Sequence, residues 1–129
     1  MQKSISHDDL LKEIVKQEKT SLEFGFYWES AEQILKQIES EAAEIREPLT
    51  RNNLSHLKEE LGDLIYASIC LCIYLNLDPT EILKDNIEKY QKRYDKLVHF
   101  VKQDGLDNLK GKSMDVLLSY WDKAKKAEI

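Results

Sequence analysis

Two pairs of acidic residues carry the clearest chemical signal in this chain. The pairs are Glu41 with Glu44 and Glu60 with Asp63, each three residues apart in helix-forming sequence. Residues at this spacing share a helix face, so each pair is expected to direct two carboxylates the same way. Converging carboxylates raise one another's pKa, and an all-oxygen ligand set favours Mg²⁺, Mn²⁺ or Ca²⁺ over zinc or copper. The pattern predicts metal-assisted phosphoryl or nucleotidyl hydrolysis.

The second pair breaks two local rules, which sets it apart from an ordinary charged surface. Gly62 lies inside the predicted helix, where glycine costs about 1 kcal/mol relative to alanine. Asp63 directly precedes an apolar run, residues 64–77. A carboxylate beside an apolar core is unfavourable unless it is paired or binds a metal. The first pair, taken alone, is equally typical of a solvated helix face, because the chain holds 24 Asp and Glu residues.

Two basic residues could hold the phosphates of a substrate. Lys89 and Arg93 are four residues apart, and Asn86 precedes them by one helical turn. Lysine offers a phosphate a point charge and arginine a bidentate fork. The alternative is a surface ladder in which the same cations pair with Asp85 or Glu88.

The two tryptophans and the histidines allow further interpretations. Trp28 and Trp121 could each stack on a base or sugar, or simply pack in the core. A ferritin-like di-iron site would need Glu-x-x-His pairs. No histidine has a glutamate three residues before it, which argues against that site; the three are His7, His56 and His99.

Composition favours one ordinary helical domain spanning residues 1–129. Of the 129 residues, 42% are hydrophobic and 33% charged, which argues against disorder. The net charge of −5, without a long basic stretch, argues against nucleic acid or a membrane as the main partner. The apolar run of about 14 residues is shorter than the roughly 20 that span a bilayer.

Cysteine usage and the first residues predict a cytoplasmic protein. Cys70 and Cys72 are two positions apart, so on a helix they point in different directions and are poorly placed to form a disulfide. We expect reduced, buried thiols. The first 25 residues are polar and amphipathic, unlike a signal peptide.

Periodicity predicts an all-α fold built around a helical hairpin. Pro48 is expected to end the second helix, and the turn that follows is short, so the second and third helices should pair antiparallel. Fifteen residues separate Glu44 from Glu60, about half on each side of the turn. All four carboxylates are therefore predicted to converge. The predicted helices cover residues 8–21, 30–47, 54–76, 81–103 and a short segment after Ser113.

Four segments of the sequence resemble the MazG-type nucleoside triphosphate pyrophosphohydrolases. They are Glu-Ser-Glu-Ala-Ala-Glu at 39–44, Glu-Glu-Leu-Gly-Asp-Leu at 59–64, Leu-Asp-Pro at 77–79 and Asn-Ile-Glu-Lys-Tyr-Gln-Lys-Arg-Tyr at 86–94. The chain looks closest to the C-terminal catalytic unit of the two-domain members, standing here as a single domain. Ser40 departs from the family pattern, because it stands where the acidic motif has its first glutamate.

The resemblance implies specific roles, an activity and an assembly. The family converts a nucleoside triphosphate to the monophosphate and pyrophosphate, and its members are all-α dimers or higher oligomers. The carried-over Mg²⁺ ligands, for which Mn²⁺ could substitute, are Glu41, Glu44, Glu60 and Asp63. The carried-over substrate contacts are Asn86, Lys89, Arg93 and Trp121.

The sequence thus predicts a Mg²⁺-dependent nucleotide pyrophosphohydrolase. One alternative is a weak or inactive helical relative that binds nucleotide or a partner protein, and another is a purely structural bundle. The run 64–75 is apolar on every face, and one short chain has few helices to surround it. We therefore expect an obligate homodimer, or a dimer of dimers, whose hairpins form a four-helix-bundle core with the acidic sites at its edges.

Overall fold

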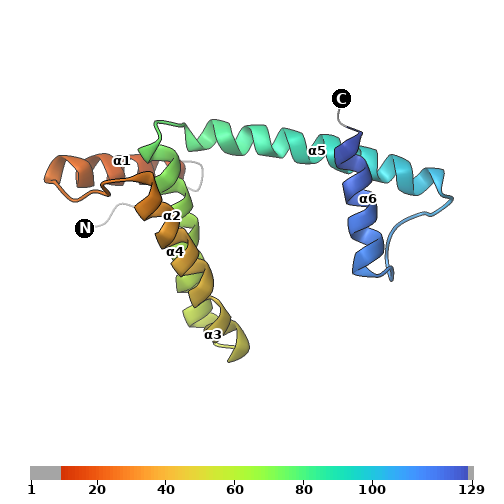
Figure 1. The fold of residues 1–129 in the computed structure, drawn as a ribbon, viewed down its shortest axis with the longest axis horizontal. Coiled ribbons are helices and arrows are strands. Elements are labelled where there is room, and N and C mark those ends of the chain that lie inside the picture. Colours follow the sequence, from red (N-terminus) through yellow and green to blue (C-terminus); the bar gives the residue numbers. More distant parts are fainter. Residues whose placement is uncertain (1–9, 128–129) are drawn as a thin grey trace. The chain divides into compact units, whose positions relative to one another are not determined.

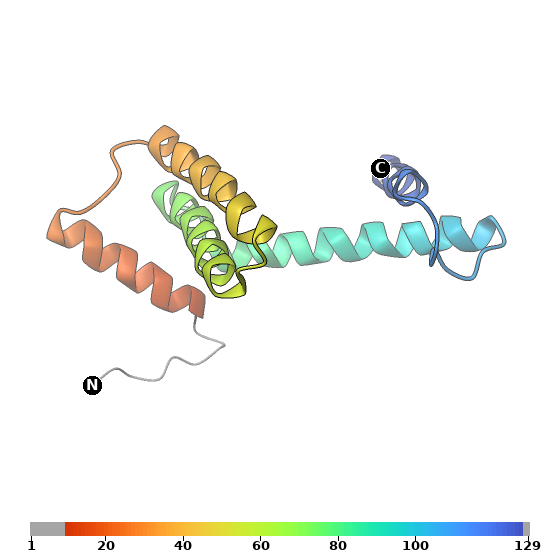
Figure 2. The ribbon, with the colours of Figure 1, turned by 90° about the horizontal axis from the view of Figure 1, so that it is seen from below.

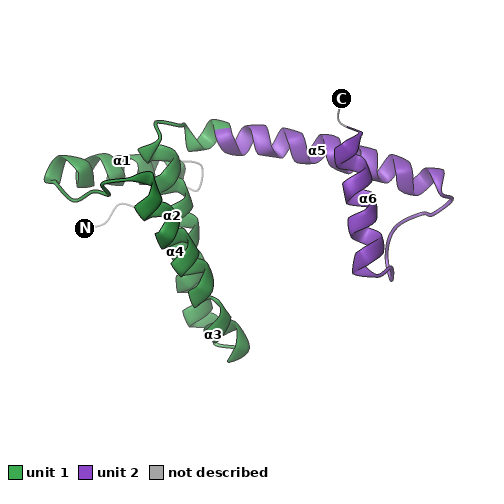
Figure 3. Ribbon diagram, viewed as in Figure 1, with its two compact units in different colours: residues 1–81 green, residues 82–129 purple. Residues whose placement is uncertain are grey.

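The computed structural model describes residues 10–127, which form helices and no strand (Figure 1). The all-α prediction is confirmed. These residues divide into two compact units, one ending at Glu81 and one beginning at Ile82 (Figure 3). The boundary falls inside α5, and the single domain spanning 1–129 stays a prediction. The six helices of the described residues are α1 (Leu10–Phe24), α2 (Ala31–Glu44), α3 (Arg46–Thr50), α4 (Leu54–Tyr74), α5 (Pro79–Gln103) and α6 (Met114–Lys126).

Side-chain caps explain where three of the helices begin. The Ser30 hydroxyl accepts a hydrogen bond from the Gln33 backbone N–H at 3.2 Å and starts α2. Asn53 does the same for α4 and Ser113 for α6. Such caps satisfy backbone donors that have no partner inside the helix. The predicted start of the first helix at residue 8 lies outside the described residues.

Pro48 does not end a helix, so that prediction was wrong. Helix α2 ends at Glu44, three residues earlier than expected, and Pro48 lies buried in the first turn of α3. Backbone N–H groups of a first turn have no acceptor inside the helix, so a proline there sacrifices no hydrogen bond. The short helix α3 closes the turn between α2 and α4.

Helices α2 and α4 lie side by side and form the predicted hairpin (Figures 1 and 2). Ile34 on α2 is only 1% exposed, and Cys70 on α4 is also buried. Helix α1 packs on α4 as well, and Gly25 follows it with a positive φ of 97°. This first unit carries all four acidic candidates and Trp28.

The second unit is built from most of α5 together with α6. Val101 and Ala124 are its buried apolar residues. The Trp121 ring lies 5.5 Å from that of Tyr90, and the Tyr120 hydroxyl donates to Asp104. Trp121 therefore packs within its own unit.

Many apolar side chains remain exposed in the single chain. On α4, Ile65 is 60% exposed, so the apolar run is not buried on all sides by this chain alone. On α5 the exposed apolar residues are Ile82, Leu83, Ile87, Tyr90 and Tyr94. Within the described residues no single helix is both long and apolar enough to cross a bilayer, while α4 and α5 taken together reach that threshold by length and composition only.

Candidate metal centre and adjoining cleft

Three of the four predicted carboxylates come together in the hairpin. Glu41 on α2 meets Glu60 and Asp63 on α4, with one ligand oxygen from each lying within 4.8 Å of the others. Glu60 and Asp63 share a face of α4 because they are three residues apart. Glu41 reaches them because the short turn places α2 alongside. This is the convergence that the spacing predicted for these three residues.

The oxygens of this cluster are suited to hold a cation. Glu41 is buried, and its Oε1 accepts a hydrogen bond from Gln37 Nε2 at 2.6 Å. Glu41 Oε2 and Glu60 Oε2 are both buried without a hydrogen-bond partner. Buried acceptors without partners are costly, and a divalent cation would satisfy both at once. The donor set, carboxylate oxygens only, fits Mg²⁺ or Mn²⁺.

The electrostatics of Glu41 agree with this fit. Burial raises the pKa of Glu41, the negative charges of Glu44, Asp63 and Glu60 raise it further, and only the hydrogen bond from Gln37 lowers it. Glu41 therefore resists ionisation until positive charge arrives.

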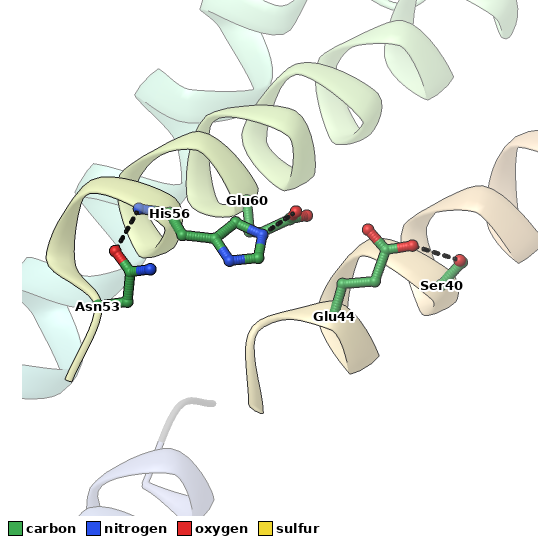
Figure 4. A network of polar contacts seen from close by, with 5 residues as sticks. All are labelled: Ser40, Glu44, Asn53, His56 and Glu60. Carbon is green, nitrogen blue, oxygen red and sulfur yellow. Dashed lines mark hydrogen bonds and ion pairs between the residues drawn. The ribbon is translucent and has the colours of Figure 1, made fainter. Parts of the chain in front are cut away.

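His56 is a neighbour of the cluster that the sequence analysis did not identify. Its Nε2 lies 3.1 Å from Glu60 Oε1, while its backbone N–H donates to the capping Asn53 side chain (Figure 4). The i, i+4 spacing of His56 and Glu60 could have suggested this contact. The pair holds one oxygen of Glu60 and leaves the other without a partner.

Glu44 lies outside the three-residue group. Its Oε1 accepts from the Ser40 hydroxyl at 3.4 Å (Figure 4). Its negative charge still raises the pKa of Glu41. Ser40, the position that departs from the family motif, is thus a direct neighbour of this predicted ligand. Glu44 as a fourth ligand stays a prediction.

A cleft of about 570 Å³ opens beside the carboxylates and contains Trp28. Glu41 and Asp63 line the cleft, as do the three consecutive aromatic residues Phe26, Tyr27 and Trp28. Trp28 is 41% exposed, so it is not simply a core residue. Drug-sized molecules and cofactors occupy clefts of this volume with apolar walls and a few polar groups.

The other predicted substrate contacts belong to the second unit. Asn86, Lys89 and Arg93 follow one another at helical spacing along α5, and Trp121 lies on α6. Asn86 and Lys89 are exposed, and Arg93 is half-buried. Their roles as phosphate and substrate contacts stay predictions.

Comparison with known families decides the relationship of this chain. Residues 29–98 match the MazG nucleotide pyrophosphohydrolase domain. The chain belongs to the MazG family. The matched segment contains all four acidic candidates and the basic residues of α5, and it begins one residue after Trp28.

Curated members of the MazG family support the assignment. A nucleoside triphosphate pyrophosphohydrolase/pyrophosphatase MazG from Thermotoga maritima is 34% identical over 101 residues, which is 78% of this chain and 38% of the relative. A nucleoside triphosphate pyrophosphohydrolase from Escherichia coli K12 is 25% identical over 109 residues, 81% of this chain and 40% of the relative. This chain spans less than half the length of either relative.

Proposed function

We propose that this MazG-family chain hydrolyses a nucleoside triphosphate to the monophosphate and pyrophosphate with Mg²⁺, for which Mn²⁺ can substitute. The observation that carries the proposal is the cluster of Glu41, Glu60 and Asp63, with two buried oxygens that have no partner. The activities named for the two relatives support the same reaction class. Cys70 and Cys72 form no disulfide, which fits a cytoplasmic enzyme.

The carboxylates would hold the ion, with Glu44 as a fourth candidate. Once bound, a divalent ion polarises a phosphoryl oxygen and lowers the pKa of a bound water. Gln37 and His56 act on the ligands themselves, because each fixes one oxygen and leaves the other buried without a partner. One of the cluster carboxylates then serves as the base that takes the proton of the attacking water.

The remaining predicted residues bind the substrate. Lys89, Arg93 and Asn86 contact the triphosphate, where Arg93 offers a bidentate fork. Trp28 stacks on the base in the cleft, and Trp121 lies near the substrate. Replacing Arg93 with alanine should raise KM and lower turnover, while leaving the metal-dependent gain in Tm near normal. Unchanged kinetics in that variant would remove Arg93 from the site.

The enzyme acts as a homodimer or a dimer of dimers. The support is the set of exposed apolar side chains on α4, since apolar patches on a soluble chain commonly mark interaction sites. Two copies of the hairpin would cover them by forming a four-helix core.

The decisive test is pyrophosphate release from a panel of nucleoside triphosphates, in Mg²⁺ and in EDTA. The wild-type chain should release pyrophosphate only with metal, and Asp63→Ala should abolish release. Metal at 100 times its dissociation constant should stabilise the wild-type fold by about 2.7 kcal/mol, and Asp63→Ala should lose that gain. Metal-independent turnover, or a full thermal shift in the variant, would refute the shared site.

A second candidate is a weak or inactive relative that binds nucleotide or a partner protein. The observation that favours it is Ser40, which replaces the first motif glutamate and hydrogen-bonds Glu44. Trace turnover together with retained nucleotide binding would support this alternative. Restoring the motif with Ser40→Glu should then raise turnover.

A further inference from the structure

The cleft has a third charged residue, separate from the metal cluster. Glu18 on α1 lines it, and Glu18 Oε1 accepts a hydrogen bond from Cys70 Sγ at 2.6 Å. Asp63 and Cys70 both line the cleft from α4, seven residues apart. Seven residues are two helical turns, about 10 Å along the axis. The cleft therefore runs from the carboxylate cluster at one end to Glu18 at the other.

Three aromatic residues lie in the segment that joins the helix carrying Glu18 to the helix carrying Glu41. Phe26, Tyr27 and Trp28 follow α1 and precede α2, and all three line the cleft. Aromatic faces stack on bases of any identity, so they bind a base without reading it. A polar group at the edge of the ring is needed to tell one base from another.

Glu18 has acceptor capacity to spare at this end. A carboxylate has about four lone-pair positions on its two oxygens, and the Cys70 thiol and the Tyr66 hydroxyl each take one of them. Burial raises the pKa of Cys70, and the hydrogen bond to Glu18 raises it further, so the thiol remains a donor. Burial raises the pKa of Tyr66 to about 12, and both the charge of Glu18 and a side-chain hydrogen bond to Glu18 add to this shift. The Tyr66 hydroxyl also donates to Gln17. The remaining positions of Glu18 can accept N–H donors.

We propose that Glu18 is the specificity-determining residue of the cleft and that it selects a guanine-type edge, a ring N–H beside an exocyclic amine. The proposal rests on the proposed function, since it places the phosphates at the metal cluster and the base at Glu18. A monophosphate nucleotide has a length comparable with the separation of these two ends.

Hydrogen-bond patterns separate the bases. Guanine presents two adjacent donors to the two oxygens of a carboxylate. Adenine and cytosine present an amine beside a ring nitrogen whose lone pair repels a carboxylate. Uracil and thymine present one N–H between two carbonyl oxygens, and hypoxanthine keeps the ring N–H but lacks the amine. Glu18 should therefore favour guanine over each of them.

The test is kcat/KM for GTP, ITP, ATP, CTP and UTP with Mg²⁺. The wild-type chain should prefer GTP over UTP by at least about 10-fold, the scale of one good bidentate contact to a base. ITP should fall below GTP, a comparison that needs no variant. Glu18→Gln keeps an oxygen for Cys70 but presents an amide N–H₂, so its preference should move toward ATP and CTP. Glu23→Gln on the same helix, exposed and outside the cleft, should keep the wild-type ranking.

Binding separates failure of this inference from failure of the proposed function. Dissociation constants for GMP, IMP and UMP, followed by quenching of tryptophan fluorescence, need no turnover. Preference for GMP that is lost in Glu18→Gln supports the role of Glu18, even if no triphosphate is hydrolysed. Equal affinity for the three monophosphates, or the same ranking in wild type and Glu18→Gln, overturns it, even if pyrophosphate release is fast.

Discussion

The two faces of α4 have opposite chemistry. One face buries polar oxygens and the other exposes apolar side chains, which is the reverse of the usual arrangement. On the cleft face, Glu60 and its neighbour across the hairpin, Glu41, bury oxygens that have no partner. On the other face, the residues exposed to solvent include Leu54, 63% exposed, together with Leu61 and Ile65. We call these three residues the outer strip.

One helix can thus require two different partners. Burying an unpaired polar group is unfavourable, and each apolar Å² left in water forgoes about 25 cal/mol. A cation relieves the first cost, and a protein surface relieves the second. The proposals for a metal centre and for a dimer therefore rest on separate faces and can fail separately.

The largest expected effect is on the outer strip. Ile65→Asp should cost the single chain little, because an exposed substitution usually changes stability by less than about 0.5 kcal/mol. In a dimer that buries Ile65, each copy would bury a charge at a cost of several kcal/mol. Light scattering should then show dissociation to the 15.1 kDa chain. The control Ser55→Asp, exposed on the same helix, should keep the wild-type mass. A wild-type protein that is folded and active as a monomer would end the dimer proposal.

The next largest effect is on kcat/KM, and it compares Glu60 on the cleft face with the adjacent Glu59. Glu60→Gln should lower kcat/KM at least about 100-fold, because even partners behind a metal ligand are worth 10- to 100-fold. Glu59→Gln removes the same charge one position earlier, about 100° around the helix, and should leave activity near wild type. Pyrophosphate release measures both. Equal losses would show a general charge effect in place of a metal site.

Gly62 lies between the two faces and should give a smaller effect. Apart from its chain neighbours and the backbone of its own helix, nothing lies within 4 Å of the place a Cβ would take at Gly62, and the backbone φ is not positive. Gly62→Ala should therefore stabilise the single chain by about 1 kcal/mol, seen as a rise in Tm of a few degrees. A fall in Tm would mean that a second copy approaches the helix closely at Gly62, which would extend the covered face beyond the outer strip.

The smallest effect is on the pH dependence of stability, because the hydrogen bond from Gln37 offsets part of the upward shift in the pKa of Glu41. The folded pKa of Glu41 is raised above its usual value of 4.5, so the unfolded chain releases this proton first as pH rises. Stability of the metal-free protein should therefore fall as pH increases from 4.5 through the raised pKa. Thermal unfolding in EDTA from pH 4 to 7 should show this fall in wild type and a weaker one in Glu41→Gln. Saturating Mg²⁺ should reverse it, and identical profiles would contradict the assignment.

Much of the hairpin and of the acidic cluster was predictable from the sequence. Three-residue spacing places Glu60 and Asp63 on one face, and a short turn brings Glu41 alongside. The separate position of Glu44 was not predictable, because periodicity gives the direction of a side chain and not its local hydrogen bonds. Pro48 was misread for a related reason. A proline ends one helix or begins another, and the capping geometry decides which.

No pattern in the sequence predicted the end of the cleft that contains Glu18. Glu18 and Cys70 are 52 residues apart, and their contact depends on how α1 packs against α4. On its own, Glu18 is one of many charged residues in an amphipathic helix. Trp28 was recognised as a candidate, and its exposure at the wall of the cleft argues against a core residue, while its role in stacking stays a prediction.

The two free thiols, two residues apart, give this chain a pair of internal chemical reporters. Cys70 lies beneath α1, bonded to Glu18, whereas Cys72 lies about 200° around the helix, toward the outer strip, with Ser68 O as its acceptor. Thiolate alkylation needs access and a proton to leave. The labelling rate at Cys70 therefore reports how often α1 separates from α4. The labelling rate at Cys72 reports how often the outer strip is uncovered. A series of mass spectra recorded over time would follow nucleotide binding through the labelling of Cys70 and subunit exchange through the labelling of Cys72.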